Sequence, residues 1–251
     1  MRASPMRTFV TGLAAFVLLG CSEDVPSGVD DTPLSGPTTP QGPQATPPNV
    51  APTAAGHDQT AECASHTGSS VTLSSAGSLD SDGQIRVYEW FEKGFLIATG
   101  PTPTIQLTLG THEILLRVTD DDGGTNDDLV IVTIRDTTAP TLAMLVSPTT
   151  LWPPNHTMHV VSRGVSASDI CDPSPAVAIT ITSDEPENGL GDGDTAPDWS
   201  VQQSGAAFDV SVRAERSGLG DGRVYTIGAV ATDGSGNGAT KGGTVRVPHN
   251  Q

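Results

Sequence analysis

The residues best suited to chemistry stand in one acidic, glycine-rich stretch, NGLGDGDTAPDW at residues 188–199. Asp192, Asp194 and Asp198 are set there among glycines, and Ca²⁺ takes six to eight carboxylate and carbonyl oxygens in proteins. The stretch is no EF-hand, because the twelfth position counted from Asp192 is Gln203 rather than glutamate. These carboxylates indicate a calcium-binding loop, with a plain glycine-rich turn as the alternative.

Motifs for enzymatic catalysis are missing from the sequence. It contains no G-x-S-x-G, no H-E-x-x-H and no P-loop. The adjacent Asp184 and Glu185 resemble a glycosidase pair only in type, since acidic pairs recur on the loops of this chain. His156 and His159 follow two prolines, which favours a loop or strand edge over a zinc site. No catalytic residue is predicted, and a hydrolase is the least favoured function.

Two tryptophans raise the alternative of carbohydrate binding. Trp199 ends the acidic stretch, and Trp152 stands in the segment LWPPNH. Together they could form a platform on which a sugar ring stacks. A tryptophan in a β-sandwich more often packs in the core or between loops, as we expect of Trp90. Both roles stay open for Trp152 and Trp199.

Composition favours a strand-rich, acidic protein that does not bind nucleic acid. The 251 residues suffice for two ordinary domains, and 28 glycines with 20 prolines favour many turns between short strands. No long helical apolar face follows residue 20, so little helix is expected. Twelve basic against 29 acidic residues give a net charge of −17, which disfavours nucleic acids and anionic lipid as partners but attracts divalent cations.

The N-terminus has the pattern of a secretion signal. Arg2 and Arg7 precede an apolar run at residues 9–19, which is too short to span a bilayer. The run ends in LLGC, which resembles the lipobox of bacterial lipoproteins. That resemblance implies removal of residues 1–20 and acylation of Cys21, and hence a cell-envelope protein anchored in the outer membrane or at the cell surface. An ordinary signal peptide with an incidental cysteine is the alternative.

A low-complexity segment follows the proposed anchor. Residues 21–48 lack aromatics and are dense in proline, threonine, serine and glycine. Such a segment cannot bury enough apolar surface to offset the entropy lost on ordering. We therefore predict a disordered tether between the lipid and the folded part of the chain.

From Asn49 onward, short alternating apolar runs predict antiparallel β-sandwiches. In QIRVYEWF, the period of two places Tyr88 and Trp90 on one face of a strand and Ile85, Val87 and Phe91 on the other. Further runs follow along the chain, and a second series begins after RDTTAP. The predicted core positions of these later strands are Ile114, Leu116 and Val118, then Val177, Ile179, Ile181, Phe208, Val210 and Val212.

The two series end alike, which suggests two related modules in tandem. Each closes with a strand, a Thr-Asp pair, a glycine-rich turn and a last strand. The pairs are Thr119-Asp120 and Thr232-Asp233, and their short side-chain oxygens can cap exposed N–H groups of the turn.

The first series resembles the PKD (polycystic kidney disease) domain, an immunoglobulin-like sandwich. NVAPTAAGHDQT, VTLSSAGSLDSDGQIRVYEWF and GTHEILLRVTDDDGGT carry the resemblance over residues 49–136, although the common W-x-F-G-D-G stretch is absent. The resemblance implies a fold more than an activity. Since some PKD modules bind calcium at their start, it also implies a calcium site at Asn49, Asp80 and Asp82. Plain turn chemistry is the alternative.

The second series, residues 137–251, resembles the hyalin-repeat-like, immunoglobulin-like modules of bacterial surface proteins. DICDPSP and ATDGSGN carry this resemblance, and LWPPNH is typical of a bacterial subgroup. Such modules are adhesive units or spacers. The resemblances together imply a non-catalytic envelope lipoprotein that serves adhesion, scaffolding or spacing, with calcium as its one expected cofactor and an unknown protein or glycan as partner.

Two cysteines remain beside the lipidated one. Cys63 lies in the first predicted module and Cys171 in the second, and in an oxidising compartment two such cysteines can pair. A bridge would join the modules and restrain the hinge between them. Two separate thiols are the alternative, because Cα atoms more than about 7 Å apart cannot be bridged.

Overall fold

The computed structural model describes residues 46–187 and 196–250, and the regular structure in these ranges is entirely β. The described residues contain no helix that is long and apolar enough to cross a membrane. The predicted signal peptide, Cys21 and nearly all of the predicted tether lie outside the described residues. The chain from Pro48 onward forms one compact unit, which contains two β-sandwiches with separate cores.

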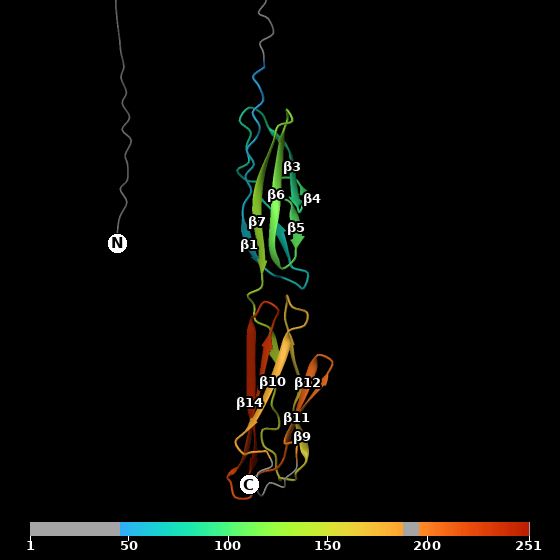
Figure 1. Ribbon diagram of the computed structural model, residues 1–251, viewed down its shortest axis with the longest axis vertical. Coiled ribbons are helices and arrows are strands. Elements are labelled where there is room, and N and C mark those ends of the chain that lie inside the picture. Colours follow the sequence, from blue (N-terminus) through green and yellow to red (C-terminus); the bar gives the residue numbers. More distant parts are fainter. Residues whose placement is uncertain (1–45, 188–195, 251) are drawn as a thin grey trace, which may run out of the picture. The chain divides into compact units, whose positions relative to one another are not determined.

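The first sandwich packs a five-stranded sheet on a two-stranded one (Figure 1). In the larger sheet β1 pairs with β7 in parallel, and the other strands are antiparallel. Its order is β1 (Gln59–Glu62), β7 (Thr125–Arg135), β6 (Gly110–Asp120), β3 (Ile85–Glu92) and β4 (Phe95–Thr99). The smaller sheet pairs β2 (Ser69–Thr72) with β5 (Thr104–Leu107).

The period-two pattern fills the core of the first sandwich as predicted. Ile114, Leu116 and Val118 of β6 are fully buried, so their predicted place in the core is confirmed. Trp90 is also fully buried, and its indole N–H donates to the carbonyl oxygen of Gly100 at 2.9 Å. A buried indole needs such an acceptor, because its N–H otherwise loses its bond to water.

The predicted faces of β3 need one correction. The period of two predicts Ile85 and Val87 on the same face, but Ile85 packs against the core while Val87 is exposed. The pairing of β3 with β6 shifts register between these two residues. A β-bulge of this kind inserts one extra residue, which reverses the facing of the residues that precede it.

The second sandwich pairs a three-stranded sheet with a four-stranded one. The first has the order β10 (Ala176–Ser183), β13 (Gly222–Thr232) and β14 (Gly238–Pro248). The second has the order β11 (Trp199–Ser204), β12 (Ala207–Arg213), β9 (Met158–Ser168) and β8 (Thr141–Ala143). Val210 and Val212 are fully buried, and the other predicted core positions of this series pack against the core while partly exposed.

Both sandwiches close with the predicted hairpin, β6–β7 in the first and β13–β14 in the second. In the first turn, Asp120 accepts from the backbone N–H groups two and four residues later, at 3.0 and 2.7 Å. In the second, Asp233 accepts from the corresponding groups at 2.9 and 2.8 Å. The carboxylate of each Thr-Asp pair therefore caps its turn.

Candidate functional site

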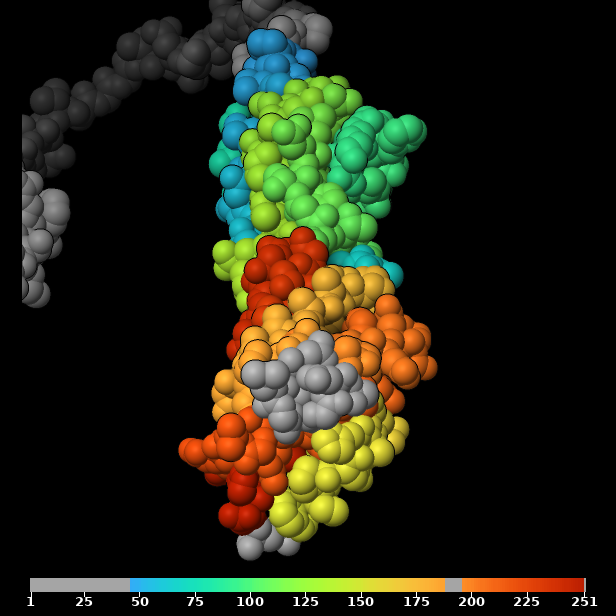
Figure 2. Space-filling model, turned by 60° about the horizontal axis from the view of Figure 1, so that its bottom comes forward, coloured from blue at the N-terminus to red at the C-terminus, as the bar shows by residue number. Residues whose placement is uncertain are grey.

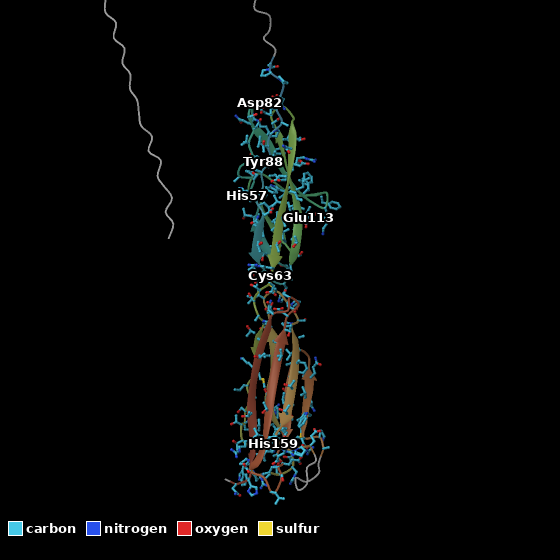
Figure 3. The ribbon with its side chains drawn as sticks, turned by 60° about the vertical axis from the view of Figure 1, so that its left-hand side comes forward. His57, Cys63, Asp82, Tyr88, Glu113 and His159 are labelled. Carbon is cyan, nitrogen blue, oxygen red and sulfur yellow. A yellow bond between two sulfur atoms is a disulfide. The ribbon has the colours of Figure 1, made fainter. Side chains whose placement is uncertain are left out.

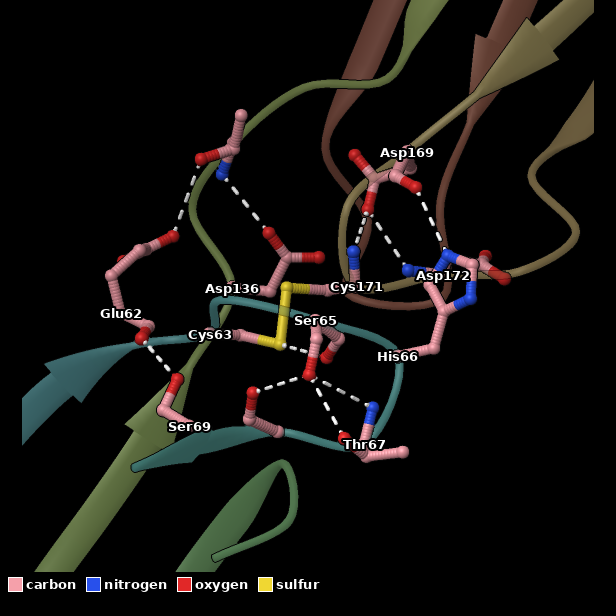
Figure 4. Close-up of a disulfide and its surroundings, with 12 residues drawn as sticks. Glu62, Cys63, Ser65, His66, Thr67, Ser69, Asp136, Asp169, Cys171 and Asp172 are labelled. Atoms are coloured by element: carbon pink, nitrogen blue, oxygen red, sulfur yellow. Dashed lines mark hydrogen bonds between the residues drawn. A yellow bond between two sulfur atoms is a disulfide. The ribbon is translucent and has the colours of Figure 1, made fainter. Parts of the chain in front are cut away.

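The two sandwiches are joined by a disulfide between Cys63 and Cys171 (Figure 4). Their Cα atoms lie 6.0 Å apart, which is within the usual range for a bridge. Cys63 follows β1 and is buried in the core of the first sandwich, and Cys171 packs against that core from the loop after β9. The sequence allowed either a bridge or two separate thiols, and the structure contains the bridge.

Hydrogen bonds near the disulfide also cross between the sandwiches. The ring of His66 contacts the backbone oxygen of Asp169 at 3.2 Å. The amide of Asn237, in the last turn of the second sandwich, donates to the backbone oxygen of Asp136 at 3.2 Å. Asp169 in turn accepts from the backbone N–H of Cys171 at 2.7 Å (Figure 4). Covalent and polar contacts therefore fix this junction together.

The junction includes one group with metal-ligand spacing. Among the described residues, Asp136, Asp169 and Cys171 are the one group of three whose ligand atoms lie within 4.8 Å of one another. The sulfur of Cys171 is bonded to Cys63 and is no thiolate, although metals bind the thiolate form. Two carboxylates remain, which are too few for a calcium site of six to eight oxygens.

The predicted site of the first sandwich lies at the end opposite the disulfide, where Figure 3 shows Asp82 far from Cys63. The amide of Asn49 donates to Asp120 at 2.9 Å, and the backbone N–H of the next residue donates to Asp82 at 3.0 Å. Asp80 presents a buried carboxylate oxygen, Oδ2, that has no hydrogen-bond partner. Burial raises the pKa of Asp80, and the carboxylates of Asp82 and Asp120 raise it further. The Oδ2 atom of Asp80, which lacks a hydrogen-bond partner and lies near other carboxylates, is therefore suited to binding a cation.

The acidic stretch in the second sandwich is described only at its end. Asp192 and Asp194 lie outside the described residues. Asp198 is fully buried just before β11, and its Oδ2 accepts from the guanidinium of Arg223 at 2.6 Å. This carboxylate therefore has a cationic partner within the protein. The acidic stretch leads into β11, a short strand that sequence reasoning did not predict.

Asp198 belongs to a buried cluster of charges under the second core. Glu215 is fully buried, and its Oε1 lies 3.6 Å from Arg223. Burial, and then the neighbouring carboxylate of Asp198, raise the pKa of Glu215 to about 7. Arg223 also donates to Glu185 at 3.2 Å and to the hydroxyl of Tyr225 at 3.1 Å. Asp198 and Glu215 thus share one buried site with Arg223, and Glu185 lies at its edge. With a pKa of about 7, Glu215 is partly protonated at neutral pH.

The cluster continues along the ends of the neighbouring strands. Burial raises the pKa of Tyr225 to about 12, and its hydroxyl donates to the backbone oxygen of Arg213 at 3.0 Å. Arg213 donates to the backbone oxygens of Pro197 and His156 at 2.8 Å each. These bonds hold the loops before β9 and β11 to the end of β12. The arrangement is therefore structural, because it leaves the loop backbone paired rather than open to a substrate.

Sequence reasoning missed Arg223 and Glu215. A signal for Arg223 was present, since alternate residues of β13 are buried, namely Arg223, Tyr225, Ile227, Ala229 and Ala231. A cation at an inward position needs a buried anion. No sequence pattern places Glu215 beside it, because Glu215 lies in the connection between β12 and β13.

The tryptophans have different environments. Trp152 lies in the loop between β8 and β9 and is 41% exposed. Trp199 opens β11 and packs edge-to-face on Tyr225, with ring centroids 6.4 Å apart. Among the described residues, no ring contact joins the two tryptophans. Trp199 therefore packs against the core, and Trp152 is the more accessible ring.

The side chains of Asp184 and Glu185, the acidic pair compared above with glycosidase carboxylates, accept hydrogen bonds from backbone N–H groups. Asp184 accepts from the backbone N–H of Val224 at 2.7 Å, and Glu185 accepts from that of Ser217 at 2.7 Å. The ring of His156 contacts Glu215 at 3.4 Å, while that of His159 contacts Thr157. The described residues therefore show no assembled catalytic set in this region.

No family model matches the chain, and no curated protein matches it. Among solved structures, it is similar to the PKD1 domain of Vibrio anguillarum Epp, at 27% identity over 36% of this chain and 99% of that one, with a TM-score of 0.30. The PKD1 domain of the Vibrio cholerae metalloprotease PrtV gives 30% identity over 34% and 99%, with a TM-score of 0.29. Titin domains Z1Z2 give 17% identity over 81% and 100%, with a TM-score of 0.48.

Proposed function

We propose that this protein is a non-catalytic, lipid-anchored component of a bacterial cell envelope that serves adhesion, scaffolding or spacing. Residues 49–136 form its PKD-like module and residues 137–251 its hyalin-repeat-like module. The observation that carries the proposal is the Cys63–Cys171 disulfide, which ties two all-β sandwiches into one covalent unit. Such a unit suits a protein whose work is to hold a position or a contact.

The disulfide also bears on the compartment. Disulfides persist in secreted and envelope proteins, whereas the cytosol keeps thiols reduced. This agrees with the apolar segment and LLGC sequence that precede the tether. A lipid at Cys21 would hold the sandwiches at the membrane, with residues 22–48 as the spacer between them.

The anchor is tested by labelling bacteria that express the full chain with a radioactive fatty acid. We expect label on the wild-type protein and its recovery with membranes, and loss of both in Cys21→Ser. Cys63→Ser serves as the matched control and should keep the label. Label that persists in Cys21→Ser, or a wild-type protein without label, would contradict the proposed anchor.

The role of the anchored unit is tested in the source bacterium. Cells that lack the chain should adhere less to surfaces or to one another, and the wild-type gene should restore adhesion. The Cys21→Ser form should fail to restore it, because the sandwiches then leave the membrane. Unchanged adhesion together with an unchanged envelope architecture in the deleted strain would contradict adhesion, scaffolding and spacing alike.

Calcium is part of the proposal for the first sandwich. Asn49, Asp80 and Asp82 would hold the ion, and the buried, unpartnered Oδ2 of Asp80 is the observation that supports it. The ion would neutralise carboxylates that now raise the pKa of Asp80. For the second sandwich, Asp192 and Asp194 remain proposed ligands, but Asp198 already pairs with Arg223.

Carbohydrate binding is a second candidate, favoured by the exposure of Trp152. A glycan array probed with the purified protein tests it. Any glycan bound through this ring should be lost in Trp152→Ala, because a stacking aromatic face is worth about 1 kcal/mol or more. The matched control is Leu145→Ala, at another exposed apolar residue of the same sandwich. An array without hits would dismiss this candidate.

A further inference from the structure

The outer face of the five-stranded sheet carries an unbroken row of apolar side chains, one from each of four adjacent strands. The strand register pairs Leu96 of β4 with Phe91 of β3, Phe91 with Leu115 of β6, and Leu115 with Leu129 of β7. We call these four residues the apolar row. None belongs to the core cluster, whose members on β6 and β7 alternate with them. The row therefore faces solvent.

The apolar row is accessible and slightly hollowed. Leu96 and Leu129, at its two ends, are 53% and 54% exposed, and Phe91 and Leu115 between them are half-buried. A hollow of about 300 Å³ lies over the middle of the row, lined by Phe91, Lys93, Gly94, Glu113, Leu115, Arg117 and Leu129. Figure 2 shows the β3–β4 hairpin, in teal-green, standing out from the surface of this sandwich.

Charged residues flank the row on both sides, in a particular order. Glu89 of β3 pairs with Arg117 of β6, so both lie on one side of the row. Two positions beyond the row, Glu113 of β6 and Lys93, in the turn that follows β3, lie on the other side, where both line the hollow. Figure 3 labels Glu113 on this sandwich. Around Phe91 and Leu115, the two central residues of the row, the charges on the two sides are therefore opposite in sign.

Arg117 is held firmly in this pattern. It donates two hydrogen bonds to Asp127, at 2.8 and 2.7 Å, and its guanidinium lies 5.7 Å from the centroid of the Phe91 ring. Two of the four basic residues in residues 49–136, Lys93 and Arg117, flank the row, in a chain whose net charge is −17. The scarce positive charge of this sandwich is thus placed beside its exposed apolar surface.

We propose that the apolar row is an interface with a second copy of this chain, related by a two-fold axis that runs along the row. Such an axis lays each row on the other and exchanges the two sides. Glu89 then faces the partner's Lys93, and Arg117 faces the partner's Glu113. In an isologous interface each contact occurs twice, so one sheet face supplies four complementary charge contacts around an apolar centre.

Self-complementarity is what favours a second copy over another partner. On β6, and on β3 with the turn that follows it, the charge on one side of the row is opposite in sign to the charge on the other side, as a two-fold axis along the row requires. Two sheets packed face to face with strands nearly aligned are an ordinary arrangement in proteins. This inference rests on the sheet register, on the exposure of the row and on the residues that line the hollow. It is independent of the lipid anchor and of calcium.

Sedimentation equilibrium of the full chain with Cys21→Ser tests the interface. We expect a monomer–dimer equilibrium in this parent. Leu129→Glu in the same chain places a charge in the row, and it should lower the association constant at least tenfold. Phe95→Ser is the matched control, because Phe95 is 76% exposed beside Leu96 but alternates to the other face of β4. Circular dichroism verifies that each variant is folded.

Charge exchange tests the orientation of the two copies. Lys93→Glu and Glu89→Lys should each weaken self-association, because each places like charges opposite one another. A mixture of the two variants should form a heterodimer more strongly than either associates with itself, since both facing pairs are then opposite in sign. A parent that stays monomeric, a dimer that survives Leu129→Glu, or a mixture no stronger than its components would overturn the proposal. A monomeric parent would assign the row to another partner.

Discussion

Glu215 makes the stability of the second sandwich depend on pH near neutrality. Its pKa is raised from 4.5 to about 7 in the fold, chiefly by burial and then by Asp198. A folded carboxyl with a raised pKa binds more protons than the unfolded chain between these two values. Its contribution to stability is therefore complete below pH 4.5 and is lost as the pH rises to about 7. We expect the free energy of unfolding to fall by on the order of 3 kcal/mol across this window.

Denaturant unfolding from pH 5 to 8 measures this slope. Glu215→Gln, which cannot ionise, should flatten it, whereas Asp209→Asn, a change at the surface of β12, should leave it unchanged. A slope that persists in Glu215→Gln would show that another group is responsible.

Calcium bound at Asp80 should stabilise the first sandwich against thermal unfolding. Its unpartnered oxygen and raised pKa both show a carboxylate that lacks positive compensation. A ligand of the folded state raises the unfolding midpoint according to its concentration relative to its dissociation constant. We expect millimolar calcium to raise the thermal midpoint by several degrees over a chelated sample, and Asp80→Asn to reduce the increase. Asp209→Asn should keep it, and an unchanged wild-type midpoint would argue against the site.

At the scale of elements, the two closing hairpins depend on their aspartates. Asp233 accepts from two backbone N–H groups of the β13–β14 turn and from the amide of Asn237. Removing this charged acceptor leaves these donors unpaired, so Asp233→Ala should destabilise the protein by roughly 2 kcal/mol. Asp233→Asn keeps an acceptor oxygen and should recover part of the loss. Chemical unfolding measures both, and equal losses would indicate that the charge rather than the hydrogen bonds stabilises the turn.

The long strands were predictable from sequence because they alternate over many residues. The burial of Ile114, Leu116 and Val118 could be predicted without knowing which strands lie beside them. Strand β1, by contrast, has four residues without a strong apolar pattern and is defined by its parallel pairing with β7. The bulge in β3 likewise depends on its register with β6, which no local pattern of Ile85 and Val87 expresses.

The candidate sites were predictable to a lesser degree, for a related reason. The acidic stretch shows three aspartates in sequence, but the environment of Asp198 depends on Arg223, which lies in another strand. The apolar row was hidden in the same way. Leu115 and Leu129 read as outward residues of separate strands, and only the register places them side by side.

At the scale of the whole molecule, the pairing of the two cysteines could not be predicted from the sequence. Cys63 and Cys171 are 108 residues apart, and whether they meet depends on how the two sandwiches are joined. The number of cysteines made a bridge plausible, whereas the 6.0 Å between their Cα atoms required the structure. The contact of His66 with Asp169 lies beside this bridge, so the junction has polar as well as covalent support.

Removal of the disulfide should loosen the junction between the sandwiches. A bridge that closes a loop of this length is expected to stabilise the fold by about 5 kcal/mol, chiefly by restricting the unfolded chain. The double variant Cys63→Ala/Cys171→Ala should therefore unfold at lower denaturant concentration. It should also be cut faster by protease between β7 and β8, because the junction then keeps only its noncovalent contacts, among them the hydrogen bonds of His66 and Asn237. Cys21→Ser, which leaves the bridge intact, should match the wild type in both measurements. A double variant with unchanged midpoint and cleavage would show that packing and hydrogen bonds alone hold the junction.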